Sequence, residues 1–270
     1  IHERLVGSEM CIRDRDTTTG KWNASLWKAS ENMPATRNVW TVDSGNNLTA
    51  YTTSTLAGDN YLCKKIGDIV HSTPMVVAAP PFFYAFDSYS SFKRNLSVTN
   101  PREKMAYVGS NDGLLHAFSL ETGQERWAFL PKSLQAKLNE AANGASYDPC
   151  STFYCHRYLL DGSPQVADVY GVFGGASKWR TMLVVGQRGG GTAYTALDVT
   201  RGESFGAGAD QAKFLWELTD AELGESWSEA AIERVSYPGG GTGATAWGVF
   251  VSSGYSENDN TQYLKEGYLY

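Results

Sequence analysis

The chain has 270 residues, of which 28 are glycine and 13% are aromatic, and its formal net charge is −6. A negative balance without a basic stripe argues against nucleic acid as a partner. No apolar run is long enough to cross a bilayer, because the longest candidate, Met75–Phe83, contains Pro80 and Pro81. Frequent glycine and aromatic residues are typical of short strands joined by tight turns, so we expect an all-β chain.

The first residues do not resemble part of a folded domain. We interpret residues 1–15 as non-native sequence, similar to a translated sequencing-adapter remnant, with a genuine charged arm as the alternative. Residues 16–66 are predicted to form a leader loop and a hairpin. In that hairpin Thr36–Asp43 and Leu48–Tyr51 flank a Ser-Gly-Asn-Asn turn.

From residue 67 onward a motif recurs about two and a half times. Repeats of short strands are the signature of a β-propeller. We therefore predict a partial, quinoprotein-like propeller of about three four-stranded blades, over about residues 67–131, 158–219 and 226–270, cut short at the end. The predicted strands are Pro74–Ala79, Lys104–Gly109, Leu114–Leu120 and Glu125–Leu130 in unit one; Gln165–Val172, Trp179–Gly186, Ala193–Val199 and Phe214–Thr219 in unit two; and Glu229–Val235, Ala246–Ser252 and a strand from about Gly267 in unit three.

Several residues recur at equivalent places in the units, and we predict that they have structural roles in the blades. They are Pro74, Gly113, Trp127, Pro164, Trp216 and Trp227. We expect Trp127 and Trp216 to pack between blades, since equivalent repeat positions usually carry core packing. The apolar run Met182–Val185 predicts burial on both faces of its strand. A closed propeller needs at least about four blades, so we expect the first and last blades to expose unpaired edges.

One helix is predicted between the first two units. It covers Lys132–Ala142, with Ser133 as a plausible N-cap and Asn143-Gly144 at its end. Leu134 and Leu138 recur at helical spacing, so we expect the helix to pack over a blade edge.

The cysteines are sparse. Cys150 and Cys155 are spaced so that they can close a small disulfide loop in an oxidising compartment, and two free buried thiols are the alternative. Cys63 stands alone, and its state is left open.

The order and spacing of the segments from roughly residue 37 to 270 resemble the C-terminal β-propeller domain of the PilY1/PilC family of type IV pilus-associated proteins. The resemblance is carried by Gly67–Val77, Tyr107–Phe118, Thr122–Pro131, Tyr158–Tyr170, Trp179–Gly186, Ala196–Thr200, Leu215–Glu217 and Trp227-Ser228. It implies a factor for pilus biogenesis and surface adhesion, exported through the periplasm to the cell surface or pilus tip. The implied partners are tip or minor pilins and host or surface ligands, and the implied role is binding and structural, not enzymatic.

The family also carries a calcium-binding loop rich in aspartates. No such loop is found in this sequence, and Glu257–Asn260 lacks its alternating acids, so we interpret that segment as a solvated turn. We therefore expect no cofactor within these residues, and calcium in the full-length family domain, at a loop beyond Tyr270.

The blade phrase also resembles quinoprotein repeats, which gives a quinone-dependent (PQQ) dehydrogenase as the alternative function. The adjacent cysteine pair of such enzymes is absent here. His116 is a candidate base, but hydrogen bonding within a sheet is the more common role for such a histidine. Ser110 and Ser163 lie in turns without a nucleophile-elbow pattern, so no Ser/His/Asp arrangement is predicted.

A binding surface is expected on loops at the ends of the propeller. The candidate loops are Phe82–Leu96, Cys150–Tyr158 and Gly202–Asp210. Arg188, beside three glycines, is either a contact at a loop tip or a solvated side chain. Asp161 is expected to order the start of its blade through an Asx-turn.

Overall fold

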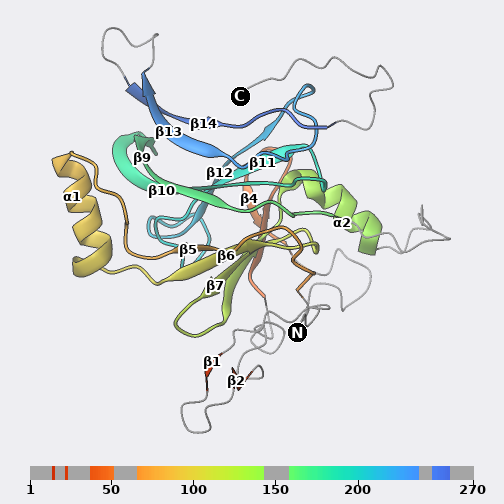
Figure 1. Cartoon of the computed structure of the whole chain (residues 1–270), viewed down its shortest axis with the longest axis horizontal. Helices are drawn as coiled ribbons and strands as arrows, with labels where there is room; N and C mark the ends of the chain where they lie inside the picture. The colour runs from red at the N-terminus through yellow and green to blue at the C-terminus, as the bar shows by residue number, and fades with distance from the viewer. Residues whose placement is uncertain are drawn as a thin grey trace.

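The computed structural model describes residues 14–15, 22–23, 37–51, 66–142, 158–236 and 245–255. Those residues form mainly antiparallel sheets, one for each repeat unit and a small one near the N-terminus, with helix α1 at one side and α2 at the other (Figure 1). The expectation of a mostly β chain with successive blade-like sheets is confirmed.

The first sheet has the strand order β4-β3-β8-β7-β6-β5. The strands of the first repeat unit lie within a few residues of their predicted positions. They are β5 (Met75–Val77), β6 (Met105–Gly109), β7 (Leu115–Ser119) and β8 (Glu125–Phe129). The Asn-Asp-Gly turn joins β6 to β7, and Gly113 takes a φ of 86° there, which a glycine adopts without strain.

The N-terminal hairpin enlarges this sheet. Its strands β3 (Val39–Val42) and β4 (Leu48–Ala50) are antiparallel, and β3 pairs in parallel with β8. The expectation of an unpaired edge on the first blade is therefore wrong at β8. A segment that precedes the repeat in sequence supplies the missing neighbour and satisfies backbone groups that would otherwise face solvent.

The second sheet has the order β12-β11-β10-β9. Its strands are β9 (Gln165–Phe173), β10 (Ala176–Gly186), β11 (Ala193–Asp198) and β12 (Lys213–Thr219). Gly174 and Gly175, with φ values of 61° and 80°, form the two-residue turn between β9 and β10. Such a turn needs positive φ at both positions, and its twist matches that of the strands.

The third sheet consists of β13 (Ala231–Ser236) and β14 (Thr245–Phe250), which pair antiparallel along their whole length. The strand predicted near Gly267 lies outside the described residues. Near the N-terminus, β1 (Asp14–Arg15) pairs with β2 (Trp22–Asn23).

Two apolar clusters lie between successive sheets. Leu183 and Val185 of β10 belong to the cluster shared with the first sheet, whereas Val184 belongs to the cluster shared with the third. Alternate residues of a strand point to opposite faces, so the apolar run is buried on both sides, as predicted. Trp127 is fully buried in the first cluster, and Trp216 is partly buried against the second.

Helix α2 (Gln135–Ala142) follows a 3₁₀ turn over Lys132–Leu134. Ser133 is not its N-cap, because the Ser133 hydroxyl instead accepts a hydrogen bond of 2.6 Å from Gln187 Nε2. Leu134 and Leu138 are fully buried in the first cluster, which fixes the helix over the sheets.

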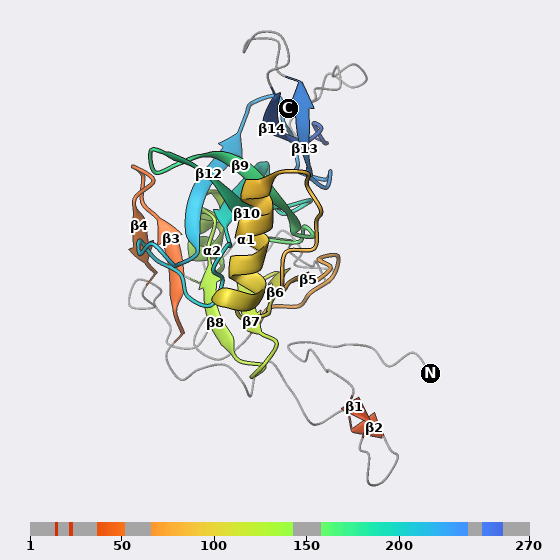
Figure 2. The ribbon, with the colours of Figure 1, turned by 90° about the vertical axis from the view of Figure 1, so that its left-hand side faces the viewer.

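A second helix, α1 (Asp87–Arg94), continues as a π-helical turn over Asn95–Thr99. The expectation of a loop over Phe82–Leu96 is therefore wrong here, although Asp and Ser are weak helix formers. Tertiary contacts outweigh that preference. The helix lies against β10 (Figure 2), and the buried Tyr89 donates a hydrogen bond of 2.8 Å to Asp168 of β9.

The residues before α1 divide between surface and interior. Phe83 is 90% exposed. Tyr84 stacks on Trp179 of β10, with ring centroids 5.3 Å apart. The apolar run Phe82–Phe86 is therefore not buried as a whole, since Phe83 and Phe86 are exposed.

Candidate functional site

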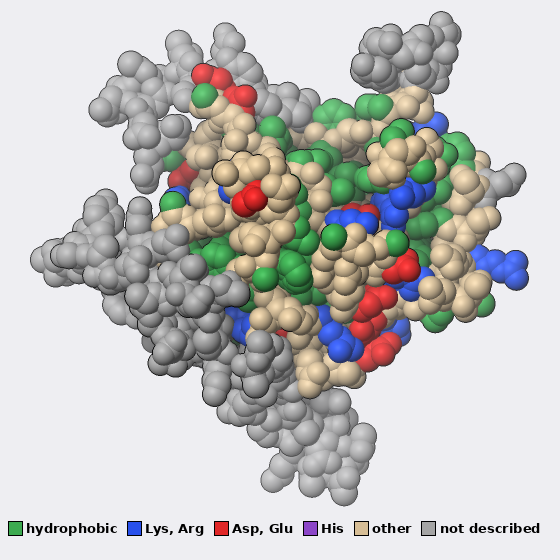
Figure 3. Space-filling view, turned by 180° about the vertical axis from the view of Figure 1, so that it is seen from behind, with side chains coloured by type: hydrophobic (Ala, Val, Ile, Leu, Met, Phe, Trp, Pro, Cys, Tyr) green, Lys and Arg blue, Asp and Glu red, His purple; other side chains and the backbone are tan. Residues whose placement is uncertain are grey.

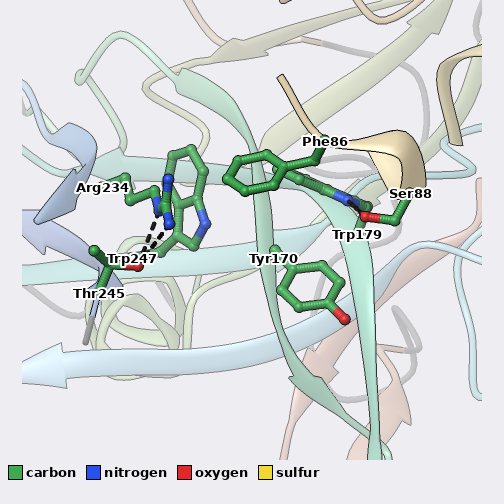
Figure 4. A pocket seen from close by; sticks show the side chains of 7 residues that line it. All are labelled: Phe86, Ser88, Tyr170, Trp179, Arg234, Thr245 and Trp247. Atoms are coloured by element: carbon green, nitrogen blue, oxygen red, sulfur yellow. Dashed lines mark hydrogen bonds between the residues drawn. The ribbon is translucent and has the colours of Figure 1, made fainter. Parts of the chain in front are cut away.

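A pocket of about 420 Å³ opens between the second sheet, the third sheet and the start of α1. Figure 4 shows Phe86, Trp179 and Tyr170 on one side and Arg234 with Trp247 on the other. Ser88 and Thr245 complete the lining. A concave site with mostly aromatic walls and few polar groups is the usual form of a ligand-binding pocket.

Strand register builds both walls. Tyr170 of β9 lies directly opposite Trp179 of β10, and Arg234 of β13 lies directly opposite Trp247 of β14. Side chains opposite each other in an antiparallel pair lie on the same face of the sheet. Each hairpin therefore contributes one cross-strand pair.

Packing behind the pocket holds Trp179 in place. Its indole Nε1 donates a hydrogen bond of 3.0 Å to Ser88 Oγ. The rings of Tyr84 and Tyr89 lie with their centroids 5.3 and 4.7 Å from that of Trp179. Burial raises the pKa of both tyrosines, with Asp168 adding to the effect, so these two phenol groups behind the pocket stay uncharged.

Arg234 is the charged side chain in the lining. Its guanidinium lies 4.7 Å from the centre of the Phe86 ring. Its Nε and Nη2 donate to the Thr245 hydroxyl at 3.1 and 2.8 Å. Within the described part of the chain, no ion pair is seen for Arg234.

A second polar cluster lies inside the first sheet. His116 Nδ1 is 2.6 Å from Glu125 Oε1, and His116 Nε2 is 2.9 Å from Ser110 Oγ. The structure thus brings a serine, a histidine and an acid together, an arrangement that the sequence pattern does not predict. Arg37 and Asp112 complete the cluster, with Arg37 Nη2 at 2.7 Å from Glu125 Oε1.

The charge state of this cluster does not suit a general base. Burial favours neutral His116, but the charge of Asp112 and the hydrogen bonds to Asp112 and Glu125 outweigh it and raise the pKa of His116 to about 9. Although burial opposes ionisation, the same contacts lower the pKa of Asp112 and Glu125. His116 is therefore a buried cation at neutral pH, while a general base must be neutral. The cluster has the form expected of a satisfied structural network.

Repeat-equivalent positions contact one another across the first two units. His71 Nδ1 lies 2.5 Å from Asp161 Oδ2, and Asp161 Oδ1 accepts a hydrogen bond of 3.0 Å from the His71 backbone. The Thr73 backbone donates to Ser163 Oγ at 3.1 Å. Asp161 thus joins the starts of two units.

The two prolines that begin the units differ in environment. Pro74 is exposed, whereas Pro164 is buried.

The glycine-rich turn of unit two is closely packed. A Cβ on Gly190 would lie 1.9 Å from the Leu159 carbonyl oxygen, so no larger residue fits there. Arg188 lies over the ring of Trp227, 5.2 Å from its centre, and Trp227 is 43% exposed. Arg188 is therefore held against an aromatic surface and is not a simply solvated side chain.

The candidate binding loops differ in how far the structure buries or describes them. Part of Gly202–Asp210 is interior, because the Gly202 carbonyl accepts a hydrogen bond of 2.7 Å from the Trp127 indole and Phe205 is buried. Cys150, Cys155, Cys63 and Glu257–Asn260 lie outside the described residues. On the face seen in Figure 3, acidic and basic side chains lie next to each other at one edge of the described part.

No group of three metal-ligating side chains occurs within the described ranges. In those same ranges, no helix has the length and apolarity to cross a membrane.

No motif in the sequence predicts the pocket. A pair of tryptophans early in the second strands of units two and three was an available signal. Their convergence depends on the unpredicted α1 and on the angle between two hairpins, which no local pattern specifies.

Comparison with known proteins identifies the family. A model described as the PilY1 beta-propeller domain matches residues 66–265. The type IV pilus biogenesis factor PilY1 of Pseudomonas aeruginosa strain UCBPP-PA14 is 31% identical over 96% of this chain and 25% of that protein. A PilY1 homolog of Xylella fastidiosa strain Temecula1 is 32% identical over 74% of this chain and 15% of its own length. The chain thus spans a quarter or less of these relatives.

Among solved structures, the crystal structure of the Pseudomonas aeruginosa PilY1 C-terminal domain is similar, with 29% sequence identity and a TM-score of 0.46. The similarity covers 68% of this chain and 32% of that one.

Proposed function

We propose that this chain, which belongs to the PilY1 beta-propeller domain family, is part of a factor for type IV pilus biogenesis and surface adhesion. In that factor it would form the propeller. The observation that carries the proposal is the family match over residues 66–265, which coincides with the repeat sheets. Relatives named as type IV pilus biogenesis factors support it.

We propose a binding and structural role without catalysis. The buried Ser110–His116–Glu125 cluster supports this, because its histidine is charged and enclosed. The quinoprotein alternative has no support from the family match or the related proteins.

The proposed location is the cell surface or pilus tip after export through the periplasm, with pilus-tip or minor pilins and surface ligands as partners. We propose that the described residues function without a cofactor and that calcium, if used, binds elsewhere in the full-length protein. The pairing of Cys150 with Cys155 fits an oxidising compartment and remains a proposal.

The test is deletion of residues 66–255 from the full-length protein in a strain that lacks the original gene. We expect loss of surface pili, measured in sheared fractions, and loss of attachment to a surface. Trp127→Ala in the full-length protein should weaken both functions by unfolding the propeller, whereas Trp227→Ala, at an exposed position, should leave piliation intact. Normal piliation and attachment by the deletion protein, exported at the normal level, would show that the proposal is wrong.

A further inference from the structure

We infer that the pocket between the β9–β10 and β13–β14 hairpins binds an aromatic side chain that stands next to a carboxylate, in a segment of a partner protein. The inference deepens the proposed binding role and rests on it. Three properties of the pocket carry it: its aromatic walls, its small number of polar side chains, and the unused hydrogen-bond donors of Arg234.

The walls favour an aromatic occupant. Phe86, Tyr170, Trp179 and Trp247 supply ring surfaces, and Trp179 meets Trp247 at 74° with centroids 6.1 Å apart. Rings prefer edge-to-face and offset arrangements of this kind, so an inserted ring finds favourable partners on two sides. The volume of about 420 Å³ lies in the range of small-ligand pockets, roughly 300–1,000 Å³.

The polar groups favour a protein side chain over a sugar. A sugar ring requires several hydrogen-bonding partners. Here Ser88 Oγ already accepts from the Trp179 indole, and Thr245 Oγ1 already accepts from Arg234. Figure 4 shows the Tyr170 hydroxyl pointing away from Arg234. The Ser88 and Thr245 hydroxyls each keep their own O–H donor, so the lining offers a sugar those two donors and Arg234, fewer partners than its several hydroxyl groups require.

Arg234 defines the charge of the occupant. A guanidinium has five N–H donors, and the Thr245 hydroxyl accepts from Nε and Nη2. The Nη1 donors and the second Nη2 donor have no acceptor among the described contacts. A carboxylate can accept two parallel bonds from that end of the group. Thr245 and the Phe86 ring hold the guanidinium at the pocket wall.

The pocket is open to a partner. Tyr170 is 43% exposed and Phe86 is 38% exposed. Ring surface combined with an arginine is typical of the residues that dominate protein–protein binding energy. Acidic and aromatic groups in one segment would satisfy both features at once.

The test uses capped dipeptides and the purified 270-residue chain, with binding followed by ligand-observed NMR. We expect N-acetyl-Phe-Glu-amide to bind about fivefold to tenfold more tightly than N-acetyl-Phe-Gln-amide, because an ion pair with Arg234 replaces a hydrogen bond from Arg234 to an uncharged amide. N-acetyl-Ala-Glu-amide should bind more weakly than either.

Three variants locate the site. Arg234→Met should weaken the Phe-Glu probe more than the Phe-Gln probe and bring the two to about the same affinity. Tyr170→Ala, at a partly exposed position, should weaken both probes. Arg126→Met is the matched control, since Arg126 pairs with Glu103 on the first sheet and should have no effect. Thermal unfolding of each variant verifies that it is folded.

Equal affinity for the Phe-Glu and Phe-Gln probes would overturn the inference, as would no binding of either at about 10 mM. Tighter binding of glucuronic acid than of both peptides would also overturn it, in favour of a carbohydrate site. Peptide binding with normal piliation after propeller deletion would refute the proposed function while supporting the pocket. Loss of piliation after the deletion, together with no peptide binding, would support the proposed function and refute the inference about the pocket.

Discussion

The buried His116 cluster makes the stability of the chain depend on pH. His116 has an ordinary pKa of 6.5 and a pKa of about 9 in the folded chain. A group whose folded pKa is raised stabilises the fold fully below its unfolded pKa and loses that contribution as pH rises through the folded pKa. Each pKa unit corresponds to about 1.4 kcal/mol, so we expect up to about 3 kcal/mol to be lost between pH 6.5 and 9.

The acidic partners of His116 make stability depend on pH in the acidic range. The pKa values of Asp112 and Glu125 are lowered in the fold, so their contribution is present above their ordinary pKa values and is lost as pH falls. The cluster is therefore most stabilising at about pH 5–6.5.

The assay is urea denaturation at a series of pH values, followed by tryptophan fluorescence. Glu125→Gln removes the negative charge of one partner of His116 and should move the decline to lower pH. His71→Gln is the matched control, because the His71 side chain is 40% exposed and that of His116 is fully buried. A wild-type free energy of unfolding that stays constant or rises from pH 6.5 to 9 would refute the reasoning, as would a His71→Gln variant that abolishes the decline.

Two further substitutions test the packing between sheets. Trp127→Ala should cost about 3–5 kcal/mol in urea denaturation, because a fully buried ring and its hydrogen bond are lost. The exposed Trp227→Ala should cost less than about 1 kcal/mol, and similar losses for the two variants would contradict the burial assignment. Gly190→Ala should cost about 1–3 kcal/mol because its Cβ would overlap a carbonyl oxygen. Gly171→Ala meets only ordinary contacts, so equal stability of the two glycine variants would refute the close approach.

Strand positions were predictable because the repeat imposes them. Gly113 indicates a turn because its position needs a positive φ. The apolar run Met182–Val185 indicates a strand that is buried on both faces. The same reasoning failed for α1, whose residues have weak helical preference and are held by Tyr89 and Trp179 contacts distant in sequence. It also failed for the edge of β8, since nothing local to Val39 specifies a parallel partner 89 residues away at Ala128.

The sequence by itself determined the repeat, the strands, the inter-sheet tryptophans as candidates and the family resemblance. These depend on alternation, turn chemistry and equivalent positions, which are local or periodic properties. Only the tertiary structure brought Ser110, His116 and Glu125 into one charged cluster and set Arg234 across an aromatic pocket from Tyr170. Each of those sites joins side chains through packing between elements, and the free energy of such packing depends on where separate segments meet.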